Sequence, residues 1–327
     1  MHWHGVRLAN AMDGAPPLTQ QPILPGTSFD YRFVAPDAGT FWYHALRPNG
    51  LALYGAFVVE ETEPPDVDHE ATLIYGGAQP YLSIGPPTLK VNGGDDYSLV
   101  VPANQRVRLR LINAASGQIL RLRVAELRAY VMAIDGQPAQ PFAARNGELT
   151  LGPGNRIDAV VDCTLPPGKT ASMTVEDTDL QPGHRPVVTI QCDPKTPGRA
   201  APREEPKPLP PNPLPEQMDF ASALRMEVVA GRTSSKNGAP LLSVKRGRTV
   251  VLGLSNPSSE NAYIHLHGHS FRLLDALDDG WKPFWLDTMP IAPGGKSRIA
   301  FVADNPGKWL IEGLAAPTGR SAWFEVT

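Results

Sequence analysis

The side chains of this sequence that could do chemistry are mainly histidines, and two pairs of them come from opposite ends of the chain. His2 and His4 form one His-x-His pair, and His265 and His267 form the other. Residues i and i+2 of a strand face the same side about 6.6 Å apart, so one pair can present two imidazoles to neighbouring metal ions. Imidazole suits copper, zinc, iron and nickel. One isolated pair could be solvated or core histidines, but two pairs together with His44 indicate a metal site.

Short strands are the elements that must position these histidines. The 327 residues include 35 prolines and 30 glycines, and the apolar runs are short and rich in Val, Ile and Leu, which is typical of strands joined by turns. The alternating pattern of residues 107–113 indicates a half-buried strand. We therefore predict an all-β protein, with further strands near residues 53–60, 226–230, 248–255, 263–275 and 297–303.

The strands group into three β units and a linker. Residues 1–62 form a short first unit, residues 70–192 a second and residues 218–327 a third. Residues 193–217 are rich in proline and charge, which favours an extended linker. The two histidine pairs then lie in the first and last units, so we predict a metal site between those units.

Charge and hydropathy exclude some partners. The net charge of −3 is small and its signs are mixed, so no nucleic-acid or anionic-membrane partner is expected. No apolar stretch approaches the roughly 20 residues of a membrane helix. Cys163 and Cys192 could pair, stay reduced or be buried, and their spacing does not decide among these states.

The start of the sequence raises two further expectations. It shows no basic-then-apolar leader, and residues 2–5 already form a motif, His-Trp-His-Gly. Either an export signal and some early strands were removed, or the gene begins inside an ancestral domain, and localisation stays open. A first unit without its early strands would expose an unpaired edge, so we predict that a second copy, another chain or a rearranged unit covers it.

Three motifs resemble copper motifs of the multicopper oxidase (laccase-like) family. They are residues 2–5, residues 39–44 (Gly-Thr-Phe-Trp-Tyr-His) and residues 265–271 (His-Leu-His-Gly-His-Ser-Phe). The likeness covers nearly the whole chain and includes Asp13-Gly14, Val91-Asn92-Gly93 and residues 154–158, 281–302 and 305–309. The resemblance implies three cupredoxin-like Greek-key β-sandwich domains as in bacterial members, the first of them N-terminally short. The family is commonly exported.

The resemblance also implies roles for single residues. His2 and His265 match type 2 copper ligands, whereas His4, His44 and His267 match type 3 ligands. Glu312 stands where another type 3 histidine is expected, and a carboxylate there could bind metal or could be a surface residue of a decayed loop. Asp13 lies where the family has a residue that assists proton movement, although Asp-Gly is also a turn signal. His269 is expected beside the ligands or in packing, and His69 and His184 are expected to be solvated.

The sequence departs from the family at the type 1 copper. Such a copper needs a thiolate and two imidazoles, and the family places its cysteine in a His-Cys-His motif after a Gly-x-Trp strand. Residues 307–318 (Gly-Lys-Trp-Leu-Ile-Glu-Gly-Leu-Ala-Ala-Pro-Thr) contain no Cys, His or Met, and Ala262 replaces the other type 1 histidine. Leu46 stands where a second type 3 histidine should follow His44. The resemblance therefore implies one or two ions of copper or zinc, no type 1 copper and no laccase activity.

Three functions fit these features. The first is a metal-dependent hydrolase of a small ester or phosphoester, of the phosphotriester type, because a bound metal lowers the pKa of its water towards ~7 and needs no electron supply. In this hypothesis Asp13 orients or deprotonates the water. The second is a copper oxidoreductase whose substrate binds at the residual copper, with dioxygen or peroxide as oxidant. The third is a non-enzymatic metal-binding or interaction protein. The sequence slightly favours hydrolysis.

Overall fold

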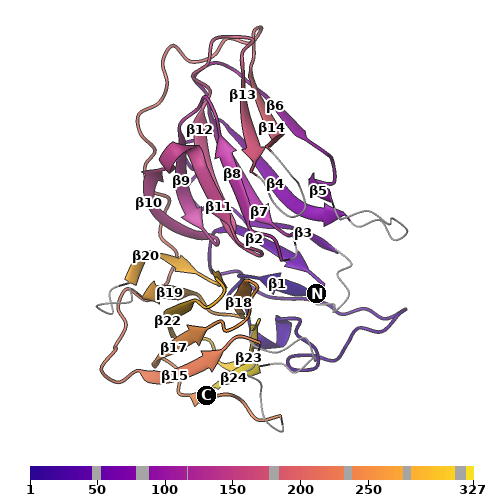
Figure 1. Ribbon diagram of the computed structural model, residues 1–327, viewed down its shortest axis with the longest axis vertical. Helices are drawn as coiled ribbons and strands as arrows, with labels where there is room; N and C mark the ends of the chain where they lie inside the picture. Colours follow the sequence, from indigo (N-terminus) through magenta and orange to yellow (C-terminus); the bar gives the residue numbers. More distant parts are fainter. Residues whose placement is uncertain are drawn as a thin grey trace.

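The computed structural model confirms the all-β prediction (Figure 1). The structure describes residues 1–45, 53–78, 88–115, 117–176, 184–231, 238–274, 281–313 and 322–327. These residues form strands β1 to β24 and two short 3-10 turns, η1 (Asn10–Met12) and η2 (Arg145–Gly147). Within these ranges, no helix is long and apolar enough to cross a membrane.

The first unit is a single antiparallel sheet in the order β1-β2-β3. Its strands are β1 (His2–His4), β2 (Gly39–His44) and β3 (Tyr54–Val59). The register of β1 and β2 places His2 opposite His44. Val6, Leu8 and Phe41 are buried in the same hydrophobic cluster as the C-terminal sandwich, so this unit completes its core against the far end of the chain.

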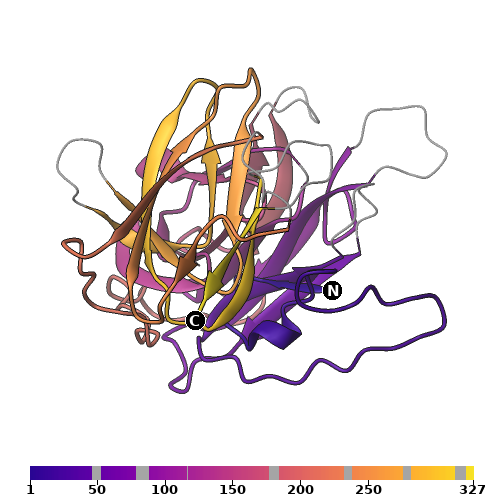
Figure 2. The same ribbon diagram turned by 90° about the horizontal axis from the view of Figure 1, so that it is seen from below.

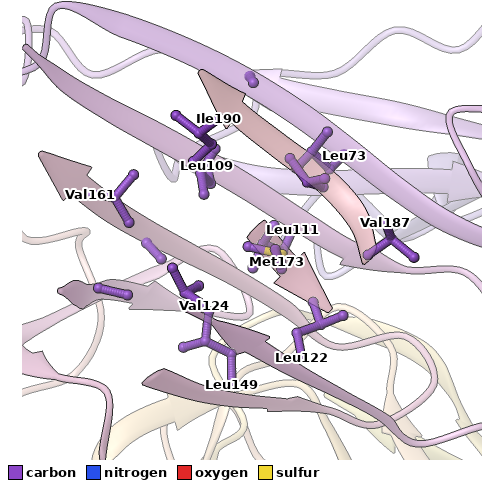
Figure 3. Packing of buried hydrophobic residues seen from close by; sticks show 14 of the residues in the cluster. Leu73, Leu109, Leu111, Leu122, Val124, Leu149, Val161, Met173, Val187 and Ile190 are labelled. Carbon is purple, nitrogen blue, oxygen red and sulfur yellow. The ribbon is translucent and has the colours of Figure 1, made fainter. Parts of the chain in front are cut away.

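The middle of the chain forms a two-sheet sandwich. One sheet has the order β10-β9-β12-β7-β4-β5 and the other β11-β8-β13-β14-β6, with Leu109, Leu122 and Met173 among the side chains packed between them (Figure 3). The strands are β4 (His69–Ala78), β5 (Thr88–Val91), β6 (Tyr97–Val101), β7 (Arg106–Asn113), β8 (Leu120–Val124), β9 (Ala129–Ile134), β10 (Gln137–Ala143), β11 (Glu148–Leu151), β12 (Arg156–Asp162), β13 (Thr170–Val175) and β14 (Arg185–Cys192).

The strand predicted at residues 107–113 is confirmed as part of β7, but the prediction that it is half-buried was wrong, because all eight residues of β7 are buried. The apolar side chains face the sandwich core as the alternation indicates, but the opposite face is covered as well. There, Arg106 binds Asp162 at 2.7 Å and also donates to the linker carbonyl of Glu204 at 2.6 Å. Arg108 donates to Glu61 at 2.7 Å. These arginines are buried because they are paired with carboxylates, and the linker also covers Arg106. The alternating sequence pattern instead predicts that they face solvent.

The C-terminal residues form a second sandwich, with sheets in the orders β15-β17-β22-β19-β20 and β16-β24-β23-β18-β21. The strand expected at residues 263–275 is two strands that belong to different sheets. The chain turns between them at Gly268, whose φ is 65° and whose Cβ would collide with the Trp309 ring. The strands are β15 (Leu224–Val229), β16 (Ser243–Val244), β17 (Thr249–Ser255), β18 (Ala262–Leu266), β19 (Phe271–Leu274), β20 (Trp281–Leu286), β21 (Thr288–Ile291), β22 (Lys296–Val302), β23 (Gly307–Glu312) and β24 (Ala322–Val326).

Residues 193–217 contain no strand or helix and run along the middle sandwich. Leu209 is buried against Met132 and Val160. The Asn212 side chain donates to the Ala38 carbonyl at 2.9 Å, which ties this segment to the first unit. This segment is therefore packed against both the middle sandwich and the first unit.

Candidate metal centre

The first sheet lies against the C-terminal sandwich (Figure 1), and five histidines from these two parts of the chain meet there. The β1 alternation turns His2 and His4 to one side, and the β1–β2 register adds His44. His265 lies in β18 and His267 follows directly after it. The ring centroids of His2 and His267 lie 3.8 Å apart and those of His4 and His265 lie 3.6 Å apart. Four of the five rings are buried and His44 is half-buried.

The ligand atoms of these side chains face one another in three pairs. His2 Nε2 lies 3.1 Å from His265 Nε2, and His4 Nδ1 lies 3.3 Å from His44 Nε2. The third pair joins His267 Nε2 to Glu312 Oε1 at 3.7 Å. Glu312 reaches the cluster because it ends β23 and lies opposite His265 in the β18–β23 ladder. The structure thus brings together all six side chains that the sequence analysis singled out as ligands.

The protonation of the His2–His265 pair suits a cation bound between its Nε2 atoms. The Nδ1 atoms of His2 and His265 each lie 3.0 Å from a backbone carbonyl, that of Asp13 and that of Asp287. A carbonyl only accepts, so each Nδ1 carries a proton, and a ring that is neutral then has a lone pair on Nε2. Burial and the nearby His267 lower the pKa of His2 and keep its ring neutral. Where both rings are neutral, these two lone pairs face each other and repel unless a proton or a metal ion lies between them.

The spacing fits a metal ion as well. Two nitrogens bound about 2.0–2.1 Å from one ion, at square or tetrahedral angles, lie roughly 2.8–3.4 Å apart. The separations of 3.1 Å and 3.3 Å in the two histidine pairs fall within this range. The 3.7 Å between His267 and Glu312 exceeds it slightly. The donor set of imidazoles and one carboxylate suits copper or zinc.

Asp13 holds the outer nitrogens of two of these rings. It follows the 3-10 turn η1, as the Asp-Gly turn signal indicates, and its buried carboxylate accepts from His267 Nδ1 at 2.9 Å and lies 3.3 Å from His2 Nδ1. Burial alone would raise the pKa of Asp13, but His267 and His2 hold it well below its usual range. The carboxylate is therefore ionised in the folded chain.

The negative charge of Asp13 changes the protonation of His267. Its buried Nε2 has no hydrogen-bond partner among the described residues. Burial opposes a charge on the ring, yet the carboxylates of Asp13 and Glu312 raise its pKa to about 10. In the metal-free chain the His267 ring is therefore positively charged and lies between two carboxylates. The same carboxylates would neutralise the charge of a bound cation. By contrast, burial and the nearby His2 lower the pKa of His44 to about 3, which leaves that ring neutral.

A further buried network holds the outer side of the cluster, and the sequence analysis missed it. Thr288 Oγ1 lies 2.8 Å from His4 Nε2 and 2.9 Å from His265 Nδ1, and it donates to Asp287 Oδ1 at 2.8 Å. The hydroxyl therefore accepts from both rings, which leaves the Nδ1 lone pair of His4 towards His44. Residues 287 and 288 carry no motif, and only the topology brings them to the histidines.

Arg156 connects this network to all three parts of the fold. Its two terminal nitrogens bind the Asp287 carboxylate at 2.8 Å and 2.6 Å, and its Nε donates to the Thr40 carbonyl at 3.2 Å. The side chain is fully buried, and it occupies the space that a Cβ at Gly5 would fill. The glycine of the first motif thus makes room for this guanidinium. The only earlier signal was the likeness of residues 154–158 to the family.

The remaining histidines and the cysteines lie outside the cluster. His269 donates from Nδ1 to the His267 carbonyl at 3.1 Å and packs against Phe301, Trp309 and Phe324. His69 and His184 are exposed. Cys163 and Cys192 are free thiols buried in the core of the middle sandwich. The predictions about Leu46 and about the segment after Gly313 fall on residues 46–52 and 314–321, outside the described ranges.

Comparisons with known proteins agree with this architecture. Three family models described as multicopper oxidase match residues 1–64, 42–174 and 208–313. A multicopper oxidase of Mycobacterium tuberculosis is 29% identical over 95% of this chain and 73% of its own length. Laccase-1 of Fomitopsis schrenkii is 27% identical over 95% of this chain and 72% of its own.

A solved structure makes the same assignment. The multi-copper oxidase of Pseudomonas thermotolerans has a TM-score of 0.84 and 31% identity, covering 100% of this chain and 85% of the other. Both sandwiches and the first sheet are therefore shared with that oxidase. The chain belongs to the multicopper oxidase family.

Proposed function

We propose that this protein is a copper-dependent oxidoreductase whose substrate and oxidant react directly at the histidine cluster. The observation that carries the proposal is the set of three facing ligand pairs. The outer nitrogens of His2, His4, His265 and His267 are held by Asp13, Asp287 and Thr288. The sequence alone slightly favoured hydrolysis. The comparisons support redox chemistry better, because the relatives described above are named as multicopper oxidases and laccases.

The proposal includes the loss of the type 1 copper. Its support is that the two cysteines, Cys163 and Cys192, lie in the core of the middle sandwich, whereas residues 218–327 contain none. Burial and the neighbouring Cys192 raise the pKa of the Cys163 thiol to about 12, so this sulfur is also a poor thiolate donor. Without a thiolate site, electrons must enter at the cluster itself.

The residues that would hold copper are the six of the facing pairs, and one or two ions are expected. When bound, copper would pass electrons from the substrate to the oxidant. The overall reaction balances with a substrate that loses two electrons and two protons. Dioxygen gains both to give hydrogen peroxide, or peroxide gains both to give two molecules of water.

Burial decides which reactants fit. His2, His4, His265 and His267 are at most 3% exposed, so a small oxidant can reach their inner nitrogens more readily than a bulky phosphotriester can. The Glu312 side chain is 30% exposed and His44 is half-buried. The substrate is therefore expected to approach on the side of His44 and Glu312, while Asp13 keeps His2 and His267 oriented from behind.

The test compares the copper-loaded chain with its His265→Ala variant, with His69→Ala as the matched control because His69 is exposed and outside the cluster. We expect copper to bind to the wild type and to His69→Ala, and to drive oxygen or peroxide consumption with small phenols or other reducing substrates. His265→Ala should lose both copper and turnover, and zinc should not support oxidation.

Four results would contradict the proposal. Anaerobic turnover of an activated ester that depends on His265 would favour the hydrolase. Copper binding without any turnover would favour a metal-binding protein, and no metal binding after supplementation would favour a metal-free interaction protein. An intense blue copper–thiolate absorption would show that a type 1 site exists.

A further inference from the structure

Residues 21–36 form an arm that projects from the first unit (Figure 2). Residues 21–30 are all exposed, and the arm contains no strand or helix. Ile23 is 42% exposed, Leu24 64% and Val34 85%. Apolar side chains that gather on an exposed surface can mark a site of protein–protein contact.

The second half of the arm has the side-chain pattern of a strand. From residue 31 to residue 36, half-buried and exposed positions alternate. Tyr31 and Phe33 turn inwards, and their rings lie 5.5 Å and 5.1 Å from the Trp3 ring. Asp30 and Arg32 turn outwards, and their side chains are 77% and 84% exposed. The arm thus has one face that packs on the first unit and one that is free.

The backbone of this segment has an open edge. Among the described residues, no backbone group of residues 28–36 is hydrogen-bonded to another backbone group. The Arg32 N–H points to Met12 Sδ at 3.4 Å. In an extended chain successive N–H groups point to opposite sides, so those of Tyr31 and Phe33 point away from Met12. Such an edge can accept a further strand.

We propose that this edge pairs with the same segment of a second copy, as an antiparallel ribbon centred on Tyr31. A two-fold axis at Tyr31 places Asp30 of each copy opposite Arg32 of the other, and Phe29 opposite Phe33. If the two Tyr31 residues exchange backbone hydrogen bonds, the flanking Asp30–Arg32 positions are non-hydrogen-bonded pairs, whose side chains lie closer together. The outward face of the arm is therefore complementary in charge to itself.

Charge also selects this register over its neighbours. A ribbon centred on Asp30 places the two Asp30 carboxylates opposite each other, and one centred on Arg32 does the same with two guanidinium groups. A parallel, in-register pair opposes like charges at both positions. Opposed like charges destabilise a cross-strand pair, so the antiparallel arrangement about Tyr31 is favoured.

The experiment is sedimentation equilibrium of the full chain and of charge-reversed variants. Asp30→Arg and Arg32→Asp each oppose like charges at both pairs, so each should weaken dimerisation about tenfold or more. The double swap Asp30→Arg/Arg32→Asp restores opposite charges and should restore the dimer. A mixture of the two single variants should form a heterodimer, because one carries two cations on this face and the other two anions.

These variants keep the proposal separate from folding and from the metal centre. Both side chains are largely exposed, so circular dichroism and copper content should match the wild type. A chain that stays monomeric at about 100 µM would overturn the proposal, as would a dimer that either single reversal leaves unchanged. A monomer whose Tyr31 and Phe33 amides resist hydrogen exchange would show instead that another segment of the same polypeptide covers the edge.

Discussion

Arg156→Met should destabilise the folded chain by about 3–5 kcal/mol, which is the usual cost of removing one partner from a buried ion pair. The guanidinium is fully buried and makes two bonds to Asp287, at 2.8 Å and 2.6 Å. It also donates to the carbonyls of Gly154, at 3.0 Å, and Thr40, at 3.2 Å. Methionine fills much of the volume, so the loss is mainly electrostatic.

The remaining carboxylates set this magnitude. Without the cation, Asp287 keeps its burial but loses its bidentate partner. Asp135 is also left without its cation, because Arg156 Nη1 lies 3.6 Å from its carboxylate. Burial and the neighbouring Asp287 already raise the pKa of Asp135 to about 6. The double variant Arg156→Met/Asp287→Asn removes both charges of the Arg156–Asp287 pair, so we expect it to be about 1–3 kcal/mol more stable than Arg156→Met alone.

The assay is urea unfolding followed by tryptophan fluorescence, with copper affinity measured on the same samples. Because a chain with several units need not unfold in one step, each transition is compared separately. Asp287 anchors Thr288 and the His265 ring, so we expect copper to bind about 10–100 times more weakly to Arg156→Met. Arg123→Met is the matched control, since the Arg123 side chain is 42% exposed and its ion pairs should contribute little to stability.

Two results would refute this reasoning. A loss below about 1 kcal/mol for Arg156→Met would mean that water or a rearranged Asp287 compensates for the guanidinium. A double variant less stable than the single one would mean that the uncompensated carboxylates are not the main cost.

Three further predictions test other parts of the structure. Asp13→Asn should weaken copper binding about 10–100-fold, because it removes the negative charge beside His2 and His267 and replaces one acceptor oxygen with an N–H donor; unchanged affinity in a competition titration would contradict this. Arg199 and Arg203 hold the pKa of Asp68 below its usual range, so its stabilisation is present above pH ~4 and is lost as the pH falls. Asp68→Asn should therefore cost about 2 kcal/mol at pH 7 and less at pH 2, whereas the exposed control Asp96→Asn should change stability at neither pH; equal losses at both pH values would count against the pairing. Leu111→Ala should cost about 2–5 kcal/mol in thermal unfolding, because Leu111 is fully buried between the sheets of the middle sandwich; a loss under 1 kcal/mol would show a core that repacks.

The parts of the centre that follow strand periodicity could be predicted from the sequence. His2 and His4 lie on one side of β1 because alternate residues of a strand do, and His44 joins them through one antiparallel register. Asp287 and Thr288 could not be found in this way, because no strand or helix repeat in the sequence relates them to His4. The burial of Arg108 also escaped prediction, since it depends on Glu61 from another part of the fold.

The energetics of the cluster bear on whether it still serves a metal. Five imidazoles, the carboxylates of Asp13 and Glu312 and the Arg156–Asp287 pair occupy one junction, and removing such charges from water costs several kcal/mol per ion. Apolar residues of similar size would often make this junction more stable in the absence of metal. The facing Nε2 atoms of His2 and His265 also repel each other unless a proton or a bound metal ion lies between them. A fold that served solely as an interaction scaffold would gain stability by losing these groups, so their arrangement favours a metal-loaded state as the one in which the protein acts.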